Sequence, residues 1–226
     1  MTSKNEKGDL QRVTLKESTK EKDLGVVIDE NLNFKEHVAQ ATNKANRMTG
    51  LIRRSFDYLT SSTFIQLYKS LVRPLLEYGH CVWQPRHVTI CSDIEDVQRR
   101  ATKLLGPLKN KLYPERLRTL GLPSLEYRRL RGDMIEVYKY LNGFYKVQRP
   151  NFQPSLSNNL RGNALKLQKN RFRLDIRGNY FSNRVVTKWN SLPDSVVVAP
   201  SVNSFKSRLD KHWRDLPILY NPSCQS

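Results

Sequence analysis

Residues 33–56 read NFKEHVAQATNKANRMTGLIRRSF and carry the clearest helical pattern of the chain. Apolar side chains recur three or four positions apart, at Phe34, Val38, Ala41, Ala45, Met48, Ile52 and Phe56. That spacing places them on one face of an α-helix, and Asn33 is a residue type that commonly caps a helix start. The stretch therefore predicts one long amphipathic helix in a mainly helical protein.

The residues before this helix alternate as β-strands do. Val13 and Leu15 are flanked by polar residues, and residues 24–28 form a short run that is rich in β-branched side chains. Such runs are typical of strands. We expect the two segments to pair as an amino-terminal β-hairpin.

Helical spacing continues after residue 56. A second helix is predicted from Thr60, with Pro74 kinking or ending its first part and Gly79 closing it. Its expected apolar stripe comprises Phe64, Leu67, Leu71, Leu75 and Tyr78. A third helix is predicted from Ser92, with acids in its first turn, where the helix dipole favours them. These acids are Asp93, Glu95 and Asp96.

Two more helices are predicted before a change in composition. One runs from Pro114 to Gly121, and a longer one opens at Ser124. Residues 148–163 are then rich in Pro, Ser and Asn, which predicts a linker. The expected domains are amino-terminal strands at 1–32, a helical domain at 33–147, this linker, a basic carboxyl-terminal extension at 164–216 and a tail at 217–226.

The extension alternates apolar and basic residues. Leu165 and Leu167, then Phe172 and Ile176, lie on either side of a turn at 169–170, which predicts a small basic β-hairpin. Helices starting near Phe181 and Ser201 would follow it. The expected fold class is thus mainly α, with an amino-terminal β-hairpin, a helical bundle, and then a basic hairpin plus helices.

The chain is strongly basic, with 39 Lys and Arg residues against 21 Asp and Glu residues in a length of 226 and a formal net charge of +18. Residues 101–200 hold +13 of that charge. A localised excess of this size points to a polyanionic partner. The three cysteines, and the lack of a long apolar run or a signal peptide, indicate an intracellular protein without membrane association.

Several kinds of chemistry have no signature in the sequence. No Asp is followed by another Asp, and glycines are never closer than eleven residues, so neither a paired-carboxylate metal site nor a glycine-rich phosphate loop is predicted. His80, Cys81, His87 and Cys91 lie within twelve positions and are residue types that bind zinc, so they could in principle form a zinc site. Because adjacent His80 and Cys81 are poorly placed to bind together and no Cys-x2-Cys spacing occurs, we expect no metal and no cofactor.

Ten short motifs together resemble one family. They are KDLGV at 22–26, LNF at 32–34, KANR at 44–47, LIRR at 51–54, LYKSLVRP at 67–74, LEYG at 76–79, VQRRATK at 97–103, YRRLRGD at 127–133, WNSLP at 189–193 and SFK at 204–206. In this order they resemble the region after the catalytic palm in reverse transcriptases of jockey-like LINE elements, which are non-LTR retrotransposons. The resemblance covers residues 22–213, nearly the whole chain.

The resemblance implies the end of an RNA-directed DNA polymerase: the last palm strands at 1–32, a helical thumb-like domain at 33–147 and a basic carboxyl-terminal extension. The family's aromatic-x-Asp-Asp motif, which binds catalytic metal ions, has no counterpart here, so the isolated chain is not expected to be an enzyme. The implied partners are RNA, DNA or an RNA–DNA hybrid, together with a palm-containing polymerase in trans, and the implied location is the nucleus.

Eleven cations are the predicted nucleic-acid-binding residues. Those inside matched motifs are Arg99, Arg100, Lys103, Arg128, Arg129 and Arg131. Those that rest on charge alone are Lys166, Lys169, Arg171, Arg173 and Arg177. The leading hypothesis is a truncated retrotransposon-derived protein that binds nucleic-acid backbones. The alternative is a domesticated helical module that binds another protein through its apolar stripes.

Overall fold

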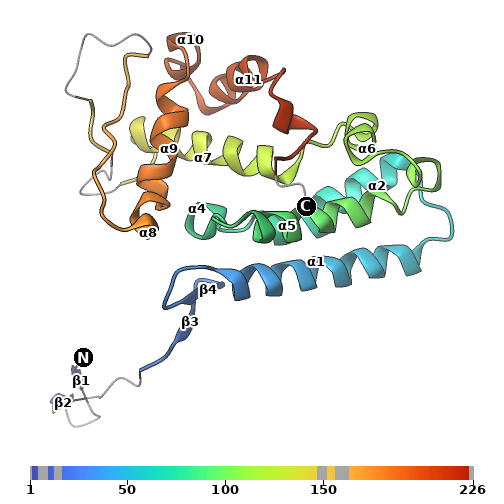
Figure 1. The fold of residues 1–226 in the computed structure, drawn as a ribbon, viewed down its shortest axis with the longest axis horizontal. Coiled ribbons are helices and arrows are strands. Elements are labelled where there is room, and N and C mark those ends of the chain that lie inside the picture. Colours follow the sequence, from blue (N-terminus) through green and yellow to red (C-terminus); the bar gives the residue numbers. More distant parts are fainter. Residues whose placement is uncertain (1, 5–9, 13–16, 147–151, 156–162, 224–226) are drawn as a thin grey trace.

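The computed structural model describes residues 2–4, 10–12, 17–146, 152–155 and 163–223 (Figure 1). Over these residues the fold is mainly helical, with an amino-terminal antiparallel hairpin, as predicted. Strand β3 (Lys20–Asp23) pairs with β4 (Val26–Asp29), and a separate short pair is formed by β1 (Thr2–Lys4) and β2 (Leu10–Arg12). The predicted strand at Val13 and Leu15 lies outside the described residues. The partner of β4 is β3.

Helix α1 (Lys35–Ser55) covers nearly the whole predicted stretch, but its amino-terminal end is held in a different way. Phe34 precedes it in a left-handed conformation, with φ at 56°. The Asp29 carboxylate accepts the backbone N–H groups of Asn33 at 3.0 Å and of Phe34 at 2.7 Å. The Asn33 side chain accepts a hydrogen bond from Arg86 instead of capping the helix. The hairpin therefore starts α1 through Asp29, and the predicted Asn33 cap is wrong.

The second predicted helix is continuous but contains a π-helical turn. It consists of α2 (Ser61–Leu67), the π segment η1 (Tyr68–Val72) and α3 (Arg73–Glu77). It begins at the predicted place, where the Thr60 side chain caps it. The N–H of Arg73 donates to the Tyr68 carbonyl, one residue further back than in an α-helix, next to Pro74, which has no N–H.

The π turn changes which side chains are buried. The buried set is Phe64, Tyr68, Val72 and Leu76, spaced four apart, whereas the predicted stripe members Leu71 and Tyr78 are exposed. A spacing of four drifts around an α-helix but stays on one face when a turn contains an extra residue. The predicted stripe is partly right, because Phe64 is buried and Leu67 and Leu75 pack against the core. It is wrong at Leu71 and Tyr78, since the π turn changes the period and brings Tyr68, Val72 and Leu76 inward instead.

Helix α4 (His80–Trp83) follows Gly79, and α5 (Val88–Thr102) starts four residues earlier than predicted. Ser92 is therefore a buried residue inside α5, and its neighbouring acids do not form the first turn. The next two helices match the prediction. They are α6 (Tyr113–Leu120), which follows the short 3-10 helix η2 (Gly106–Leu108), and α7 (Leu125–Leu141), whose start is capped by Ser124.

The predicted basic hairpin is wrong. Its residues form an isolated bridge between Leu167 and Pro154, and residues 175–178 are helical. The Asn190 side chain bonds both the N–H and the carbonyl of Leu167 at 2.9 Å, and the indole of Trp189 donates to the Leu165 carbonyl. Because these backbone groups bond to side chains of a helix, they are not available to a second strand.

The carboxyl-terminal elements are helical. They are α8 (Asp175–Gly178), α9 (Phe181–Asn190), α10 (Asp194–Val197), α11 (Val202–His212) and the 3-10 helix η3 (Pro217–Leu219). Residues after α11 return to the start of α7, where Ser124 donates to the Leu219 carbonyl at 2.8 Å. Much of the predicted 217–226 tail is therefore packed against the body, while residues 224–226 lie outside the described part.

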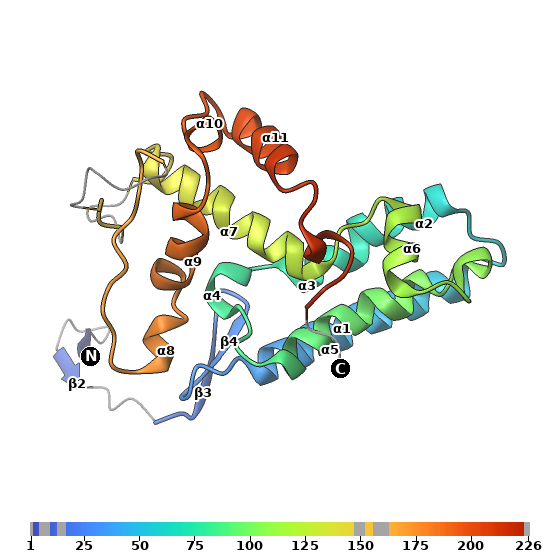
Figure 2. The ribbon, with the colours of Figure 1, turned by 45° about the horizontal axis from the view of Figure 1, so that its top comes forward.

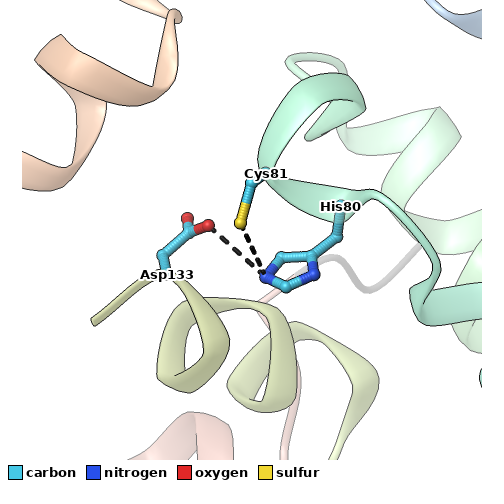
Figure 3. A group of neighbouring side chains, drawn as sticks. All are labelled: His80, Cys81 and Asp133. Carbon is cyan, nitrogen blue, oxygen red and sulfur yellow. Dashed lines mark hydrogen bonds and ion pairs between the residues drawn. The ribbon is translucent and has the colours of Figure 1, made fainter. Parts of the chain in front are cut away.

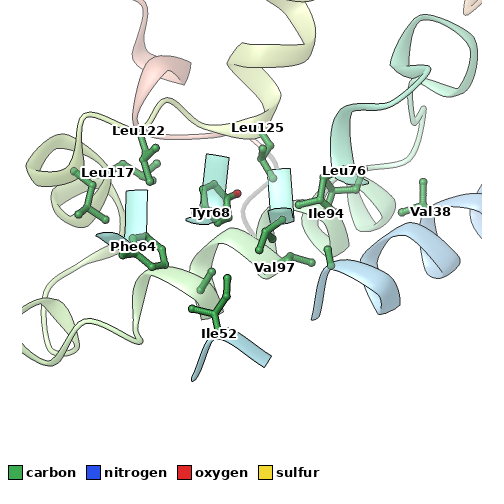
Figure 4. Packing of buried hydrophobic residues seen from close by; sticks show 14 of the residues in the cluster. Val38, Ile52, Phe64, Tyr68, Leu76, Ile94, Val97, Leu117, Leu122 and Leu125 are labelled. Atoms are coloured by element: carbon green, nitrogen blue, oxygen red, sulfur yellow. The ribbon is translucent and has the colours of Figure 1, made fainter. Parts of the chain in front are cut away.

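Two apolar cores meet at α7. The first joins α1, α2–α3, α5, α6 and the start of α7 (Figure 4). The second joins the rest of α7 to α9, α10 and α11, where Phe205 stacks on Tyr138 with ring centroids 4.5 Å apart. The division between cores thus falls within α7, ahead of the predicted linker at 148–163, most of which lies outside the described residues. In the described part of the chain, none of the helices has both the length and the apolar character to cross a bilayer.

Candidate nucleic-acid interface

Seven exposed cations line two adjoining hollows along α1 and the end of α5, which we call the basic groove. They are Lys44, Arg47, Arg53, Arg54, Arg100, Lys103 and Lys109. The hollows have volumes of about 880 and 830 Å³ and share Asn46 and Gly50. One carboxylate, that of Asp57, also lines them.

The cations of the basic groove are not neutralised within the protein. None of the seven forms an ion pair or a side-chain hydrogen bond with another residue in the described ranges. Unpaired, exposed ammonium and guanidinium groups retain their full attraction for a polyanion. This surface can therefore bind phosphate without first breaking internal contacts.

The pattern of α1 explains why its outer face is basic. Val38, Ala45 and Ile52 are buried against the first core, so the opposite side carries the polar residues. On that side Gly50 has no side chain, which leaves a hollow between Arg47 and the following turn. Two of the cations lie in the last turn, where the helix dipole favours positive charge.

Two of the three predicted cations on α5 belong to the basic groove. Arg100 and Lys103 are exposed and line it. Arg99 points elsewhere, since its guanidinium pairs with Asp96 at 2.8 Å and lies 5.3 Å from the ring centroid of Tyr113. The structure therefore does not place Arg99 with the other two.

Two of the three predicted arginines of α7 form ion pairs inside the protein, and the third is buried. Arg128 binds both carboxylate oxygens of Glu77, with one of the two distances at 2.9 Å. Arg131 binds Asp210 through two contacts of 2.5 and 2.8 Å. Arg129 has a relative exposure of 1%. None of the three guanidinium groups is freely presented to a phosphate backbone.

The five predicted cations of the extension form a second basic surface. Lys169, Arg171, Arg173 and Arg177 are exposed on the segment that leads into α8, and Lys166 is half-buried. Figures 1 and 2 both show this segment at the opposite end of the molecule from α6, which lies beside the end of α1. The two basic surfaces are therefore separate.

None of the predicted nucleic-acid-binding residues lies on α1, although α1 supplies four cations of the basic groove. The segment count for residues 1–50 is nearly neutral because residues 1–35 hold seven cations and seven acids, and only two of the groove cations lie before residue 51. A signal was present, since no acid occurs between Glu36 and Asp57 while four of the groove cations do. Lys109 follows η2 and is brought to the groove only by tertiary packing.

A buried carboxylate supports α7 beneath these surfaces. Glu95 is fully buried and accepts hydrogen bonds from the Tyr113 hydroxyl at 2.5 Å and from the Leu125 N–H at 3.0 Å. Burial raises the pKa of this carboxyl, and the hydrogen bonds act in the opposite direction. Glu95 therefore caps α7 from α5, which differs from its predicted role at the start of its own helix.

Comparisons with known proteins give one weak relative. The chain is 27% identical over 127 residues to B0403.1, an uncharacterized protein of Caenorhabditis elegans, and the match covers 54% of this chain and 64% of that protein. The chain thus spans less than two thirds of the relative's length. No protein-family model matches the chain, and no solved structure matches it. The relative's printed name assigns no activity.

Proposed function

We propose that this chain binds the phosphate backbone of RNA, DNA or an RNA–DNA hybrid through the basic groove. The observation that carries the proposal is the set of seven exposed cations without internal partners. The resemblance of the sequence motifs to the thumb of a LINE-type reverse transcriptase supports the same partner class. Within this proposal the chain is a retrotransposon-derived fragment without polymerase activity of its own.

The dimensions of the groove suit a duplex. From Lys44 to Arg54 the axis of α1 rises by about 15 Å. One strand of duplex DNA carries one charge per about 3.4 Å of the duplex axis, so the helix face is long enough to run beside roughly four phosphates of one strand. Contacts of this kind position a protein on a duplex without reading its sequence. We therefore expect little base preference.

Two aromatic side chains extend the groove at its end. Phe56 lines it with a relative exposure of 39%, and Tyr58 follows with 83%. Exposed aromatic rings beside cations provide stacking surfaces for unpaired bases. A junction between duplex and single strand would place phosphates on the cations and a base on one of these rings.

Salt titration of binding to an RNA–DNA hybrid tests the proposal. Neutralising four groove cations together, Arg47→Gln, Arg54→Gln, Arg100→Gln and Lys103→Gln, should weaken binding by roughly 100-fold and lower the salt slope by about 3 to 4. The charge-matched control neutralises four exposed cations outside the groove: Lys22→Gln, Lys188→Gln, Lys211→Gln and Arg214→Gln. Equal loss in both variants would reduce the effect to net charge and remove the groove from the proposal.

The alternative of a protein-binding module is favoured by one observation. A hollow of about 370 Å³ between the amino-terminal hairpin and the α8–α9 region has a mainly apolar lining that includes Ile28, Val82 and Tyr180. If the groove variants bound the hybrid as the wild type does, the partner to test next would be a palm-containing polymerase fragment supplied in trans. The proposed nuclear location would be tested by fluorescence imaging of the tagged chain.

A further inference from the structure

Three side chains that can bind metals converge between α4 and α7. Figure 3 shows His80 and Cys81 turned toward Asp133. The His80 Nε2 atom lies 3.5 Å from the Asp133 Oδ1 atom and 3.5 Å from the Cys81 Sγ atom. The ligand atoms of all three residues lie within 4.8 Å of one another.

The two separations that involve His80 match edges of a zinc coordination tetrahedron. Zinc binds sulfur at about 2.3 Å and imidazole nitrogen or carboxylate oxygen at about 2.0 to 2.1 Å, so tetrahedral angles place N and S about 3.6 Å apart and N and O about 3.3 Å apart. The observed values of 3.5 Å for both pairs differ from these edges by about 0.2 Å or less. We propose that His80, Cys81 and Asp133 form a binding site for Zn²⁺ or a similar divalent transition metal.

The second nitrogen of His80 supports this assignment. Its Nδ1 atom lies 3.2 Å from the backbone carbonyl oxygen of Glu77. When Nδ1 carries the proton and donates it to this carbonyl, the lone pair of Nε2 points toward Cys81 and Asp133. Histidines that bind metals usually have such a partner on the other ring nitrogen, because it sets the tautomer and the ring orientation.

Arg184 from α9 orients the other two residues. Its guanidinium donates to Asp133 Oδ1 at 3.0 Å and to Oδ2 at 3.2 Å, and it also donates to the backbone carbonyl of Cys81 at 3.1 Å. A carboxylate oxygen has two lone pairs and can serve Arg184 and a metal together. Arg184 is thus a positioning residue, because it would hold two ligand-bearing segments without touching the metal.

The backbone leaves room for the site. A Cβ atom at Gly132 would lie 2.6 Å from His80 Nε2, so only glycine lets the imidazole rest against α7 at this point. His80 also borders a hollow of about 220 Å³, and Cys81 borders the larger apolar hollow described above. A water molecule entering from either side would complete four ligands.

The metal would change the chemistry of Cys81. Burial raises the pKa of this thiol to about 12, so without metal it is protonated and is a poor nucleophile. Metal binding forms the sulfur–metal bond and releases the thiol proton to solvent, with no change in oxidation state. The bound ion would tie α4, which contributes Trp83 to the first core, to α7 and α9 of the second core.

The site has a different composition from the zinc set weighed in the sequence. His87 and Cys91 do not belong to the cluster, and Asp133, 52 positions after Cys81, supplies the third ligand. The adjacent His80 and Cys81 do point to one place, against expectation, because the short helix α4 turns both toward α7 (Figure 3). Spacing along the chain could not indicate this.

A cobalt titration of the purified full chain, after treatment with a chelator, tests the proposal. We expect one Co²⁺ per chain, a sulfur-to-cobalt charge-transfer absorption, and displacement of the cobalt by one equivalent of Zn²⁺. Cys81→Ala should remove the charge-transfer band, and Asp133→Asn should weaken cobalt binding by at least tenfold. Circular dichroism of each variant would establish that it is folded.

Matched variants separate this site from other thiols and imidazoles. Cys91→Ala and His87→Ala each remove a similar group outside the cluster and should leave the band and the stoichiometry unchanged. A wild-type chain that takes up no cobalt, or a charge-transfer band that persists in folded Cys81→Ala, would overturn the proposal. Neither outcome depends on whether the basic groove binds nucleic acid.

Discussion

Helices α1 and α7 both carry several cations, but those of α7 are paired or buried inside the protein, whereas those of α1 that line the basic groove are exposed and have no ion-pair partner among the described residues. On α7, Arg128 and Arg131 bind Glu77 from α3 and Asp210 from α11. On α1, Arg47 and Arg54 have no carboxylate partner among the described residues. The central helix thus uses its charges to join other helices, while the peripheral helix presents them to solvent.

This difference shows that a run of cations in a sequence does not reveal how many are available to a ligand. Arg128 and Arg131 find their carboxylate partners more than 50 positions away in the chain, at Glu77 and Asp210. A guanidinium already bound to a carboxylate must lose that contact before it can bind phosphate. Whether a cation is available to a ligand therefore depends on the fold. The difference between α1 and α7 can be tested by five measurements.

The largest effect should follow removal of the carboxylate that caps α7. Glu95→Ala would leave the Tyr113 hydroxyl and the N–H groups of Leu125 and Glu126 without their buried acceptor. We expect the free energy of unfolding to fall by about 4 kcal/mol, because each buried donor left unsatisfied costs about 1–3 kcal/mol. Urea denaturation measures the loss. The exposed Asp93→Ala on the same helix should cost less than about 0.5 kcal/mol.

The next effect separates stability from binding at Arg128. Arg128→Ala should lower the free energy of unfolding by about 1.5 kcal/mol, since it breaks a half-buried bidentate pair with Glu77. Arg73, whose Nε lies 3.8 Å from Glu77, limits the loss. Hybrid affinity should change less than about threefold when the variant is folded. A large loss of hybrid affinity with an unchanged free energy of unfolding would show that Arg128 contributes to binding and not to stability.

The opposite result is expected in the basic groove. Arg100→Gln with Lys103→Gln should weaken hybrid binding by about tenfold and reduce the salt slope by about 1.8. The urea midpoint should stay the same because neither side chain has a partner to lose. Fluorescence anisotropy at several salt concentrations measures both binding quantities. A shift of the urea midpoint with unchanged hybrid affinity would show that Arg100 and Lys103 contribute to stability and not to binding.

A smaller effect is expected at Arg131. Its partner Asp210 has a side-chain exposure of 47%, so solvent screens the pair. We expect Arg131→Ala to cost about 0.5 kcal/mol. A double-mutant cycle with Asp210→Ala would isolate the pair energy. A coupling above about 2 kcal/mol would mean that α7 depends on this contact as strongly as on Arg128.

The smallest expected effect is a change in the free energy of unfolding with pH. Because burial raises the pKa of Glu95 above its ordinary value of 4.5, the folded state holds this proton more tightly than the unfolded state. The contribution of Glu95 to stability is therefore greatest below that ordinary value and declines as pH rises through the raised pKa. Relative to Glu95→Gln, the wild type should lose stability across this window in urea titrations. A wild-type advantage that grows with pH would contradict the assignment.

Much of the helical fold could be predicted because its signals are local. The apolar spacing of residues 34–56, the Thr60 and Ser124 caps and the Gly121 stop all act within a few residues of their own helices. Hydrogen bonds between a cap and its first turn need no distant partner. Errors arose where the period changed, as in the π turn, or where a strand would have needed a distant partner, as in residues 165–177.

The candidate sites were less predictable for the same reason. Of the cations inferred from family-like motifs, Arg100 and Lys103 lie in the basic groove, whereas Arg128 and Arg131 pair with carboxylates of other helices and Arg129 is buried. In the sequence, His80 and Cys81 could be considered for a zinc site only with their neighbours His87 and Cys91. The third member of the proposed site, Asp133, lies on α7. Sequence spacing describes neighbours along the chain, and a site is made of neighbours in space.

The sequence by itself determined the class of the fold, the positions of the main helices and the large positive charge, because local periodicity and composition depend on nothing beyond the chain segment concerned. Tertiary structure alone decided which charges are free, that Glu95 caps α7, and that His80, Cys81 and Asp133 meet. Each of these outcomes depends on contacts between helices, where packing of two cores against α7 selects the partner of every polar side chain.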